Sequence, residues 1–352
     1  MAPPRPSPGK PCYPRQRPRH KSGLRVLVSG LFWAVLVPAL VLAFHAQAER
    51  PVDWRAEFPR TDFSKRTLDF NEIRFDGARR DTIPPIDEAE FWPVAEIKNI
   101  GKLEPVLSIG INGDFRAYPL RILLWHEIVN DTVGGVPVLV SYCPLCNSGV
   151  VFDRRIEGRT LSFGNTGRLR HYDMVMYDRA TESWWQQFTG TAIMGAMTGK
   201  RLKVLPARLE SLERFRDRAP QGQVLLPPDA RLRRYGTTPY IRMDTVKPLP
   251  GRFPYGLPEG VGPMARVVIV GGEAWTLGLL RQKKQIEVRD LILTWEPGQN
   301  SIHDTKWISF GRDIGNVTVQ RKAGGGLVDV PYDVAFAFVF AAFMPKAKLH
   351  YK

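Results

Sequence analysis

The residues best suited to chemistry in this chain are Cys143 and Cys146, which stand three positions apart in the segment Tyr142-Cys143-Pro144-Leu145-Cys146. Only three cysteines occur in the 352 residues. The spacing lets both sulfurs reach one another or a single soft metal ion, so it predicts thiol chemistry or metal ligation rather than packing. Turn amides or nearby cations can lower the pKa of such a thiol, and the thiolate is the reactive form.

A thiol–disulfide redox protein that uses Cys143 and Cys146 as its catalytic residues is the first interpretation. Pro144 removes one backbone N–H and stiffens the turn between the two sulfurs. The residues that follow, 147–155, have a β-like pattern, whereas a thioredoxin fold places this motif at the start of a helix. A disulfide would be the expected resting state in an exported protein, unless a reductant or a metal intervenes.

Metal ligation by the same pair is the second interpretation. Two thiolates are too few for a closed zinc site, which has four ligands. Copper(I) accepts two thiolates with a histidine or methionine as the third ligand. His126 is the third ligand that we expect for Cys143 and Cys146, although a histidine within an apolar helix is more often structural. Met174 and Met176 are expected to be core residues.

A non-enzymatic scaffold with a structural disulfide is the third interpretation, and the sequence leaves open whether the chain is an enzyme. A disulfide that closes so short a loop contributes little stability by loop entropy, which argues against it. We expect five other side chains to form the wall of a pocket beside the pair, the alternative being a solvated turn with one buried aromatic residue. These are Glu127, Asp178, Arg179, Glu182 and Trp185.

The N-terminal region predicts export. Residues 1–23 are basic and rich in proline, and residues 24–48 combine an uncharged apolar stretch with Ala46-Gln47-Ala48, a site of the kind that signal peptidases cleave. The segment is either a signal peptide or a single transmembrane anchor over residues 24–44. The positive residues before it keep the N-terminus in the cytoplasm, so the remainder is expected on the periplasmic or cell-surface side.

The charge of the chain argues against nucleic-acid binding. Residues 1–48 contain seven Lys or Arg and no acid, and subtracting these from the total of +15 leaves +8 for the exported part. That excess is spread along the chain without a basic stripe interleaved with aromatic residues. The expected partners are therefore the membrane, if the anchor is retained, and a redox partner or a copper donor protein.

The rest of the chain predicts a strand-dominated α+β fold. Residues 49–95 read as an irregular lead-in, 96–219 as a β-rich half that carries the cysteines, 220–262 as a proline-rich connection, and 263–352 as a second β-rich half. Strands are expected at 105–111 and 136–142, and a helix at 121–130. Residues 332–343 are expected to form a buried strand or helix.

The second half echoes the first and suggests two pseudo-repeated halves. Residues 266–280 resemble the pattern of residues 106–123, a strand, a turn and a second apolar run. The cysteines have no counterparts in the second half, because Thr294-Trp295-Glu296-Pro297 falls where they would stand.

An ordered set of motifs resembles the DUF3179 family. The motifs lie at residues 83–87, 126–131, 142–146, 152–154, 163–167, 176–183, 185–187 and 205–207. The resemblance covers about residues 80–345 and implies an exported protein with a Cys-x-x-Cys centre, in a family of unknown function. Asn147, Thr166 and Trp184 stand where the family more often has glycine, serine and leucine.

Overall fold

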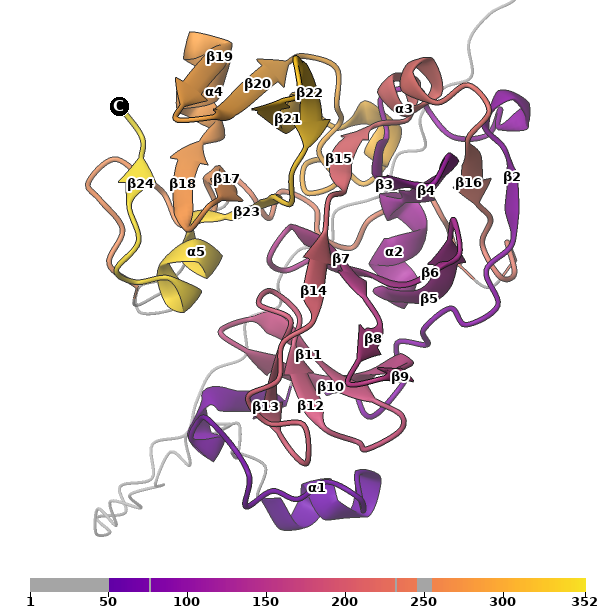
Figure 1. The fold of residues 1–352 in the computed structure, drawn as a ribbon, viewed down its shortest axis with the longest axis vertical. Coiled ribbons are helices and arrows are strands. Elements are labelled where there is room, and N and C mark those ends of the chain that lie inside the picture. The colour runs from indigo at the N-terminus through magenta and orange to yellow at the C-terminus, as the bar shows by residue number, and fades with distance from the viewer. Residues whose placement is uncertain (1–50, 76, 232, 246–254) are drawn as a thin grey trace, which may run out of the picture. The chain divides into compact units, whose positions relative to one another are not determined.

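The computed structural model describes residues 51–75, 77–231, 233–245 and 255–352 (Figure 1). Strands dominate this part of the chain and the helices are short, so the predicted α+β, strand-dominated fold is confirmed. No helix within the described ranges is long and apolar enough to cross a membrane. The predicted signal peptide or anchor at 24–48 lies outside the described residues.

The first half begins with a hairpin, a helix and a second hairpin. Strands β3 (Pro105–Ile111) and β4 (Asp114–Pro119) pair around Asn112-Gly113, whose positive φ angles fit a tight hairpin turn. Helix α2 (Leu120–His126) follows. It is shorter than the predicted helix at 121–130, because Glu127 adopts a left-handed conformation (φ 57°) that ends the helix. Strand β5 (Ile128–Val133) then begins.

The strand that carries Cys143 lies in the middle of a buried sheet. Strand β6 (Val136–Cys143) is antiparallel to β5 on one side and to β7 (Ser148–Asp153) on the other. Strand β14 (Lys203–Leu205) pairs with the outer edge of β7. The predicted strand at 136–142 is therefore confirmed, and its apolar residues are buried because the sheet is covered.

A second sheet is inserted between β7 and β14. The small hairpin of β8 (Arg155–Ile156) and β9 (Arg159–Thr160) leads into β10 (Phe163–Arg170) and β11 (Asp173–Asp178). Strands β12 (Trp184–Gln186) and β13 (Thr191–Met194) complete this antiparallel meander. The chain then returns through β15 (Arg208–Ser211), α3 (Leu212–Arg218) and β16 (Gln223–Leu225) to the sheet of β3 and β4.

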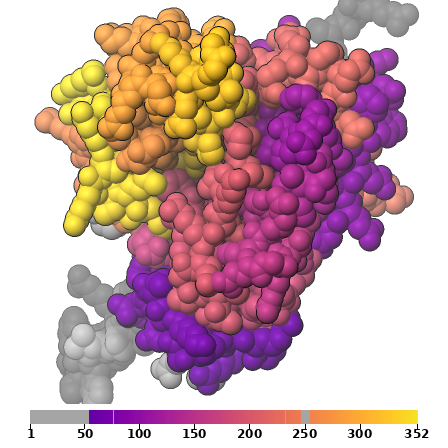
Figure 2. Space-filling model, viewed as in Figure 1, coloured from indigo at the N-terminus to yellow at the C-terminus, as the bar shows by residue number. Residues whose placement is uncertain are grey.

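The lead-in runs along the surface of this half (Figure 2). It contains α1 (Pro51–Glu57), η1 (Phe70–Glu72), β1 (Ile73–Phe75), β2 (Phe91–Pro93) and η2 (Val94–Glu96). Strand β1 extends the inserted sheet beside β10, and β2 pairs with β16. Trp54 and Phe58 are fully buried against Trp184, which attaches the lead-in to the inserted sheet.

The second half has the same kinds of element in the same order. It contains β17 (Arg266–Val270), β18 (Glu273–Thr276), α4 (Leu277–Lys283), β19 (Gln285–Val288), β20 (Leu291–Glu296), η3 (Ile308–Phe310), β21 (Asn316–Ala323), β22 (Gly326–Asp329), β23 (Asp333–Phe336), α5 (Ala337–Phe343) and β24 (Leu349–His350). The stretch at 332–343, predicted as a strand or a helix, contains both.

The strand pairing of the two halves also corresponds. The sheet order β23-β17-β18-β24 matches β15-β3-β4-β16, and β19-β20-β21-β22 matches β5-β6-β7-β14. In each pair of sheets only the contacts β24–β18 and β16–β4 are parallel. Lys284 ends α4 with a φ of 65°, as Glu127 ends α2. Descent of the two halves from one repeated unit stays a prediction.

Candidate functional site

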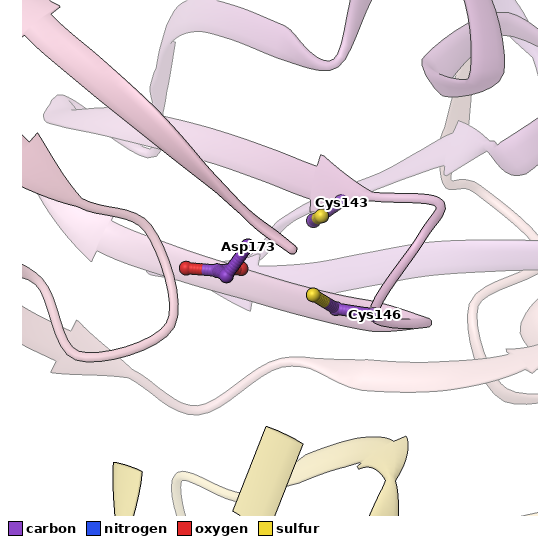
Figure 3. Close-up of side chains that lie close together, drawn as sticks. All are labelled: Cys143, Cys146 and Asp173. Atoms are coloured by element: carbon purple, nitrogen blue, oxygen red, sulfur yellow. The ribbon is translucent and has the colours of Figure 1, made fainter. Parts of the chain in front are cut away.

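The candidate site consists of two thiols and one carboxyl group in the interior. One side-chain ligand atom from each of Cys143, Cys146 and Asp173 lies within 4.8 Å of the other two. Figure 3 shows that the two sulfurs face one another and the carboxyl group of Asp173. Cys143 is 2% exposed, and Cys146 and Asp173 are fully buried. The cysteines are close but not disulfide-bonded.

A tight turn brings the second sulfur back beside the first. The backbone N–H of Cys146 donates to the carbonyl of Cys143 at 3.2 Å, and that of Asn147 donates to the carbonyl of Pro144 at 3.3 Å. Asn147 has a φ of 53°, in the left-handed region that glycine and asparagine adopt most readily. This conformation explains why asparagine is acceptable where the resemblance leads us to expect glycine.

A two-residue turn places Asp173 beside the sulfurs. Arg170 pairs with Asp173 across the β10–β11 hairpin, and His171 and Tyr172 between them have φ angles of 52° and 66°. Two successive positive φ angles define the turn that suits a tight hairpin, and neither residue is a glycine. The carbonyl oxygen of Tyr172 lies 3.3 Å from Sγ of Cys146 and 3.7 Å from Sγ of Cys143. The turn therefore covers both sulfurs directly.

The carboxyl group of Asp173 is only partly satisfied by hydrogen bonds. Its Oδ2 accepts from Nε2 of Gln186 at 2.6 Å and from the backbone N–H of Phe188 at 2.9 Å. Its Oδ1 has no hydrogen-bond partner in the described part of the chain. Burial raises the pKa of Asp173 to about 7, although these donors favour the charged form. Asp173 can therefore exchange a proton near neutral pH.

The two thiols are neutral in the closed, reduced site. Burial raises the pKa of both, and that of Cys146 is raised further than that of Cys143. The neighbouring Cys146 and the backbone of Met174 favour the Cys143 thiolate, whereas the negative charges of Asp173 and Glu127 oppose it. This direction is opposite to the lowered thiol pKa expected from the motif, because desolvation and neighbouring acids dominate.

Two of the predicted pocket residues belong to the surroundings of the pair. Glu127 is buried, accepts a hydrogen bond from Nδ2 of Asn165 at 2.6 Å, and has a pKa raised to about 8, mainly by burial. Trp185 is fully buried in the same hydrophobic cluster as both cysteines. Its indole N–H donates to Oδ2 of Asp178 at 3.0 Å.

The family is identified by a match to residues 80–347. The matching family model is described as "Protein of unknown function (DUF3179)". The chain belongs to the DUF3179 family. No curated protein and no solved structure matches this chain.

Not every predicted residue of the DUF3179 motifs reaches the cysteines. The Nδ1 atom of His126 lies 2.9 Å from the carbonyl of Pro84, and its Nε2 lies 2.8 Å from the hydroxyl of Tyr235. Both ring nitrogens are thus engaged elsewhere, and the third group beside the sulfurs is Asp173 rather than His126.

The remaining predicted residues fasten the lead-in to the inserted sheet. Arg179 pairs with Asp87 at 2.8 Å, and Glu182 pairs with Arg80 at 2.8 Å. Asp178 is fully buried and accepts hydrogen bonds from Thr181. These DUF3179 residues form a partly buried, ion-paired turn instead of the wall of an open pocket.

The second half of the DUF3179 domain holds the cysteine turn, a contribution that the sequence did not indicate. The carbonyl of Cys146 accepts from the backbone N–H of Phe336 at 2.9 Å, and the carbonyl of Val334 accepts from Nδ2 of Asn147 at 2.8 Å. Asp333 accepts from the hydroxyl of Ser148 at 2.5 Å and from the N–H of Gly149 at 3.1 Å.

A histidine of the second half also contacts the turn. His303 is fully buried, with Nε2 2.7 Å from the carbonyl of Pro144 and Nδ1 3.2 Å from Nη2 of Arg266. A carbonyl only accepts and a guanidinium only donates, so His303 must carry its proton on Nε2. Burial and the charge of Arg266 lower the pKa of His303 to about 3, which keeps it neutral.

The sequence offered one weak signal for Asp173 and Asp333. Each is an acid at the first position of a strand, β11 or β23, and is followed by three apolar residues. An acid in such a place is rarely buried unless it has a partner or a chemical role. His303 stands in a polar segment and carried no comparable signal.

Proposed function

We propose that Cys143 and Cys146 form a reversible dithiol–disulfide couple and that Asp173 accepts and returns its proton. The observation that carries the proposal is the buried carboxyl group of Asp173, which has one oxygen within 4.8 Å of both thiol sulfurs. A buried carboxyl group with a pKa of about 7 is matched to proton transfer near neutral pH. The predicted export of the domain would place the couple in an oxidising compartment.

The two thiols would have different roles. Cys143 has the less strongly raised pKa, so it is the proposed nucleophile. Asp173 takes the proton of Cys143, whose thiolate attacks one sulfur of a substrate disulfide. The expelled thiolate takes this proton back from Asp173, and a mixed disulfide is left on Cys143. Asp173 takes the proton of Cys146, whose sulfur then attacks Sγ of Cys143 and releases the second half of the substrate. The two protein protons end on the two released thiols.

The burial of the pair limits the substrate. Cys143 and Cys146 are almost inaccessible, and the His171–Tyr172 turn lies across them. A substrate disulfide can reach Cys143 only after this turn moves. A small disulfide, or a disulfide on an extended segment, fits this constraint better than one within a folded partner protein.

The test is a redox titration of the purified chain with Cys12 replaced by serine, so that only the two site thiols remain. Equilibration across ratios of reduced to oxidised dithiothreitol, followed by alkylation and mass measurement, should give one two-electron transition. Cys143→Ser and Cys146→Ser should each abolish it. A pair that stays reduced, or stays oxidised, under every ratio would contradict the proposal.

Metal binding is the second candidate function, and the compactness of the site favours it. The ligand atoms around one zinc ion are separated by roughly 3–4 Å, and the three groups already lie within 4.8 Å of one another. A carboxylate is a harder ligand than the histidine or methionine that copper(I) accepts, so Asp173 favours zinc over the copper expected earlier.

Native mass spectrometry separates the two candidates. Zinc or copper(I) added to the reduced chain should bind in one equivalent if the site is a metal centre, and Cys143→Ser should remove that equivalent. A redox couple that needs no metal predicts instead a metal-free mass two hydrogens lighter after oxidation.

A further inference from the structure

A cavity of about 690 Å³ opens in the second half, apart from the cysteine site. It is bounded by the start of β17, by α4 and by the connection that joins β20 to β21. Leu277, Leu279 and Trp295 supply apolar walls, and Arg266, Arg281 and Arg312 supply positive charge. Neither of the two candidate functions uses this cavity.

The two halves differ at the position where the cavity opens. In the first half Arg121, the second residue of α2, forms an ion pair with the buried Glu104 at 2.6 Å. The equivalent second residue of α4 is Gly278. Leu212 and Ala337 are the first residues of the corresponding helices α3 and α5. The backbone N–H of Leu212 donates to the carbonyl of Glu104, and that of Ala337 donates to the carbonyl of Ala265. Ala265 is therefore the counterpart of Glu104.

The loss of these two side chains leaves space. Gly278 and Ala265 both line the cavity. A Cβ built on Gly278 would meet only Oγ1 of Thr276, at 4.0 Å. The second half thus keeps the backbone arrangement that surrounds the Arg121–Glu104 pair and lacks the pair itself.

The charge on the cavity wall is positive. Three arginines line it against two acids, Asp244 and Asp313. Asp244 is already paired with Arg266 at 2.7 Å and with Arg312 at 2.5 Å. Asp313 accepts hydrogen bonds from the backbone N–H groups of Gly298, Gln299 and Gly315. Both acids are therefore engaged within the protein.

One guanidinium group retains unused donors at the opening. Arg281 is exposed at the rim and has no acidic partner there among the described ion pairs. Arg266 is buried, and its Nη1 and Nη2 already donate to Asp244 and Ser301. Arg266 therefore adds positive charge to the wall, whereas Arg281 can donate to a bound acceptor.

We propose that this cavity binds a small organic anion, a carboxylate with a compact apolar body. The carboxylate would accept from Arg281, since a guanidinium group matches the geometry of a carboxylate. The apolar body would pack against Trp295 and Leu279. The proposal does not depend on the redox or metal chemistry of the cysteines.

The test uses benzoate and hexanoate as probes, with benzyl alcohol and hexanol as neutral controls of similar shape. Saturation-transfer NMR on the purified chain should detect both carboxylates and weaker or no binding of the alcohols. Arg281→Gln should raise the dissociation constant about fivefold, the loss expected for a partly exposed charged contact. Lys283→Gln removes the same charge from the same helix outside the cavity and should leave binding unchanged.

Gly278→Phe fills the cavity and should abolish binding of both probes. Its thermal unfolding should match that of the parent chain, because the new Cβ enters open space. Equal binding of carboxylates and alcohols, or binding that survives in a folded Gly278→Phe variant, would overturn the proposal. Either result would leave the redox titration of the cysteines unaffected, so the two proposals fail independently.

Discussion

The two halves of the domain share the order and pairing of their strands and helices, yet they differ in what connects equivalent strands. In the first half β6 and β7 are joined by the tight turn from Pro144 to Asn147, which carries a cysteine. In the second half β20 and β21 are joined by the long connection 297–315, which contains His303. The first half thus holds the two cysteines, and the second half supplies contacts that support their turn.

The inserted sheet is the second difference between the halves. Strands β10 to β13 lie between β7 and β14 and bring Asp173 to the cysteines. In the second half, β21 and β22 correspond to β7 and β14. These two strands are joined directly at Gly324-Gly325, without an insertion. The site therefore requires three parts of the chain that the sequence separates widely: the turn after β6, the inserted hairpin and the second half.

Loss of the Asp333 contacts should have the largest effect on how the halves fit together. Asp333→Ala removes the acceptor for Ser148 and Gly149, which lie next to the cysteine turn. We expect the free energy of unfolding to fall by about 3 kcal/mol, because buried donors lose their partner. Urea unfolding measures this loss, and faster alkylation of Cys143 should accompany it.

Asp329→Ala is the matched control, since Asp329 bridges the halves through Arg208 on a partly exposed surface. It should cost less than 1 kcal/mol and leave cysteine alkylation unchanged. Equal losses in the two variants would contradict the special role of Asp333 at the site.

The pH dependence of stability should reveal the buried Asp173. Its folded pKa of about 7 lies above the ordinary value of 3.8. Ionisation of Asp173 is therefore less favourable in the folded state than in the unfolded state. The free energy of unfolding falls as the pH rises from about 4 to about 7, and the whole loss is present above pH 7. Asp173→Asn should remove that cost and gain about 4 kcal/mol at pH 8 relative to pH 4. Urea unfolding at both pH values measures the difference, and an unchanged pH dependence would show that Asp173 is ionised without penalty.

Replacement of His303 should have a smaller effect. His303→Phe leaves the carbonyl of Pro144 and one N–H of Arg266 without a partner, at an expected cost of about 1–2 kcal/mol. His350→Phe, at a half-buried ring that stacks on Trp275, should cost less than 1 kcal/mol. Thermal unfolding of the two variants makes the comparison, and equal costs would contradict a structural role for the His303 contact.

The comparison between the halves can be tested by converting one into the other. Ala265→Glu combined with Gly278→Arg would reproduce in the second half the pair that Glu104 and Arg121 form in the first. Ala265→Glu alone should destabilise the domain because it buries an unpaired carboxyl group, whereas Gly278→Arg alone should leave stability unchanged. The double variant should recover about 1 kcal/mol of coupling energy in a double-mutant cycle. A coupling energy of zero would show that positions 265 and 278 are not arranged like positions 104 and 121.

The sequence predicted the local features that depend on neighbouring residues. The hairpin at Asn112-Gly113, the apolar strand before Cys143 and the strand-dominated fold follow from turn chemistry and periodicity. The helix end at Glu127 was missed, since a left-handed glutamate has no sequence signature. His126 was misplaced as a ligand because its partners, Pro84 and Tyr235, lie far away in the chain.

The candidate site was only half predictable for the same reason. Cys143 and Cys146 stand out by their spacing. Asp173 joins them only through the pairing of β10 with β11, and His303 and Asp333 join through contacts between the halves. Such long-range contacts leave no local pattern in the sequence.

Proton transfer to Asp173 is tested most directly by the rate at which oxidised glutathione oxidises the reduced pair, measured from about pH 5 to about pH 9 in the Cys12→Ser chain. We expect an inflection near pH 7 that disappears in Asp173→Asn and persists in Asp153→Asn, a carboxyl group that pairs with Arg155 outside the site. Identical profiles in all three proteins would contradict the proposed proton transfer between Asp173 and the cysteines.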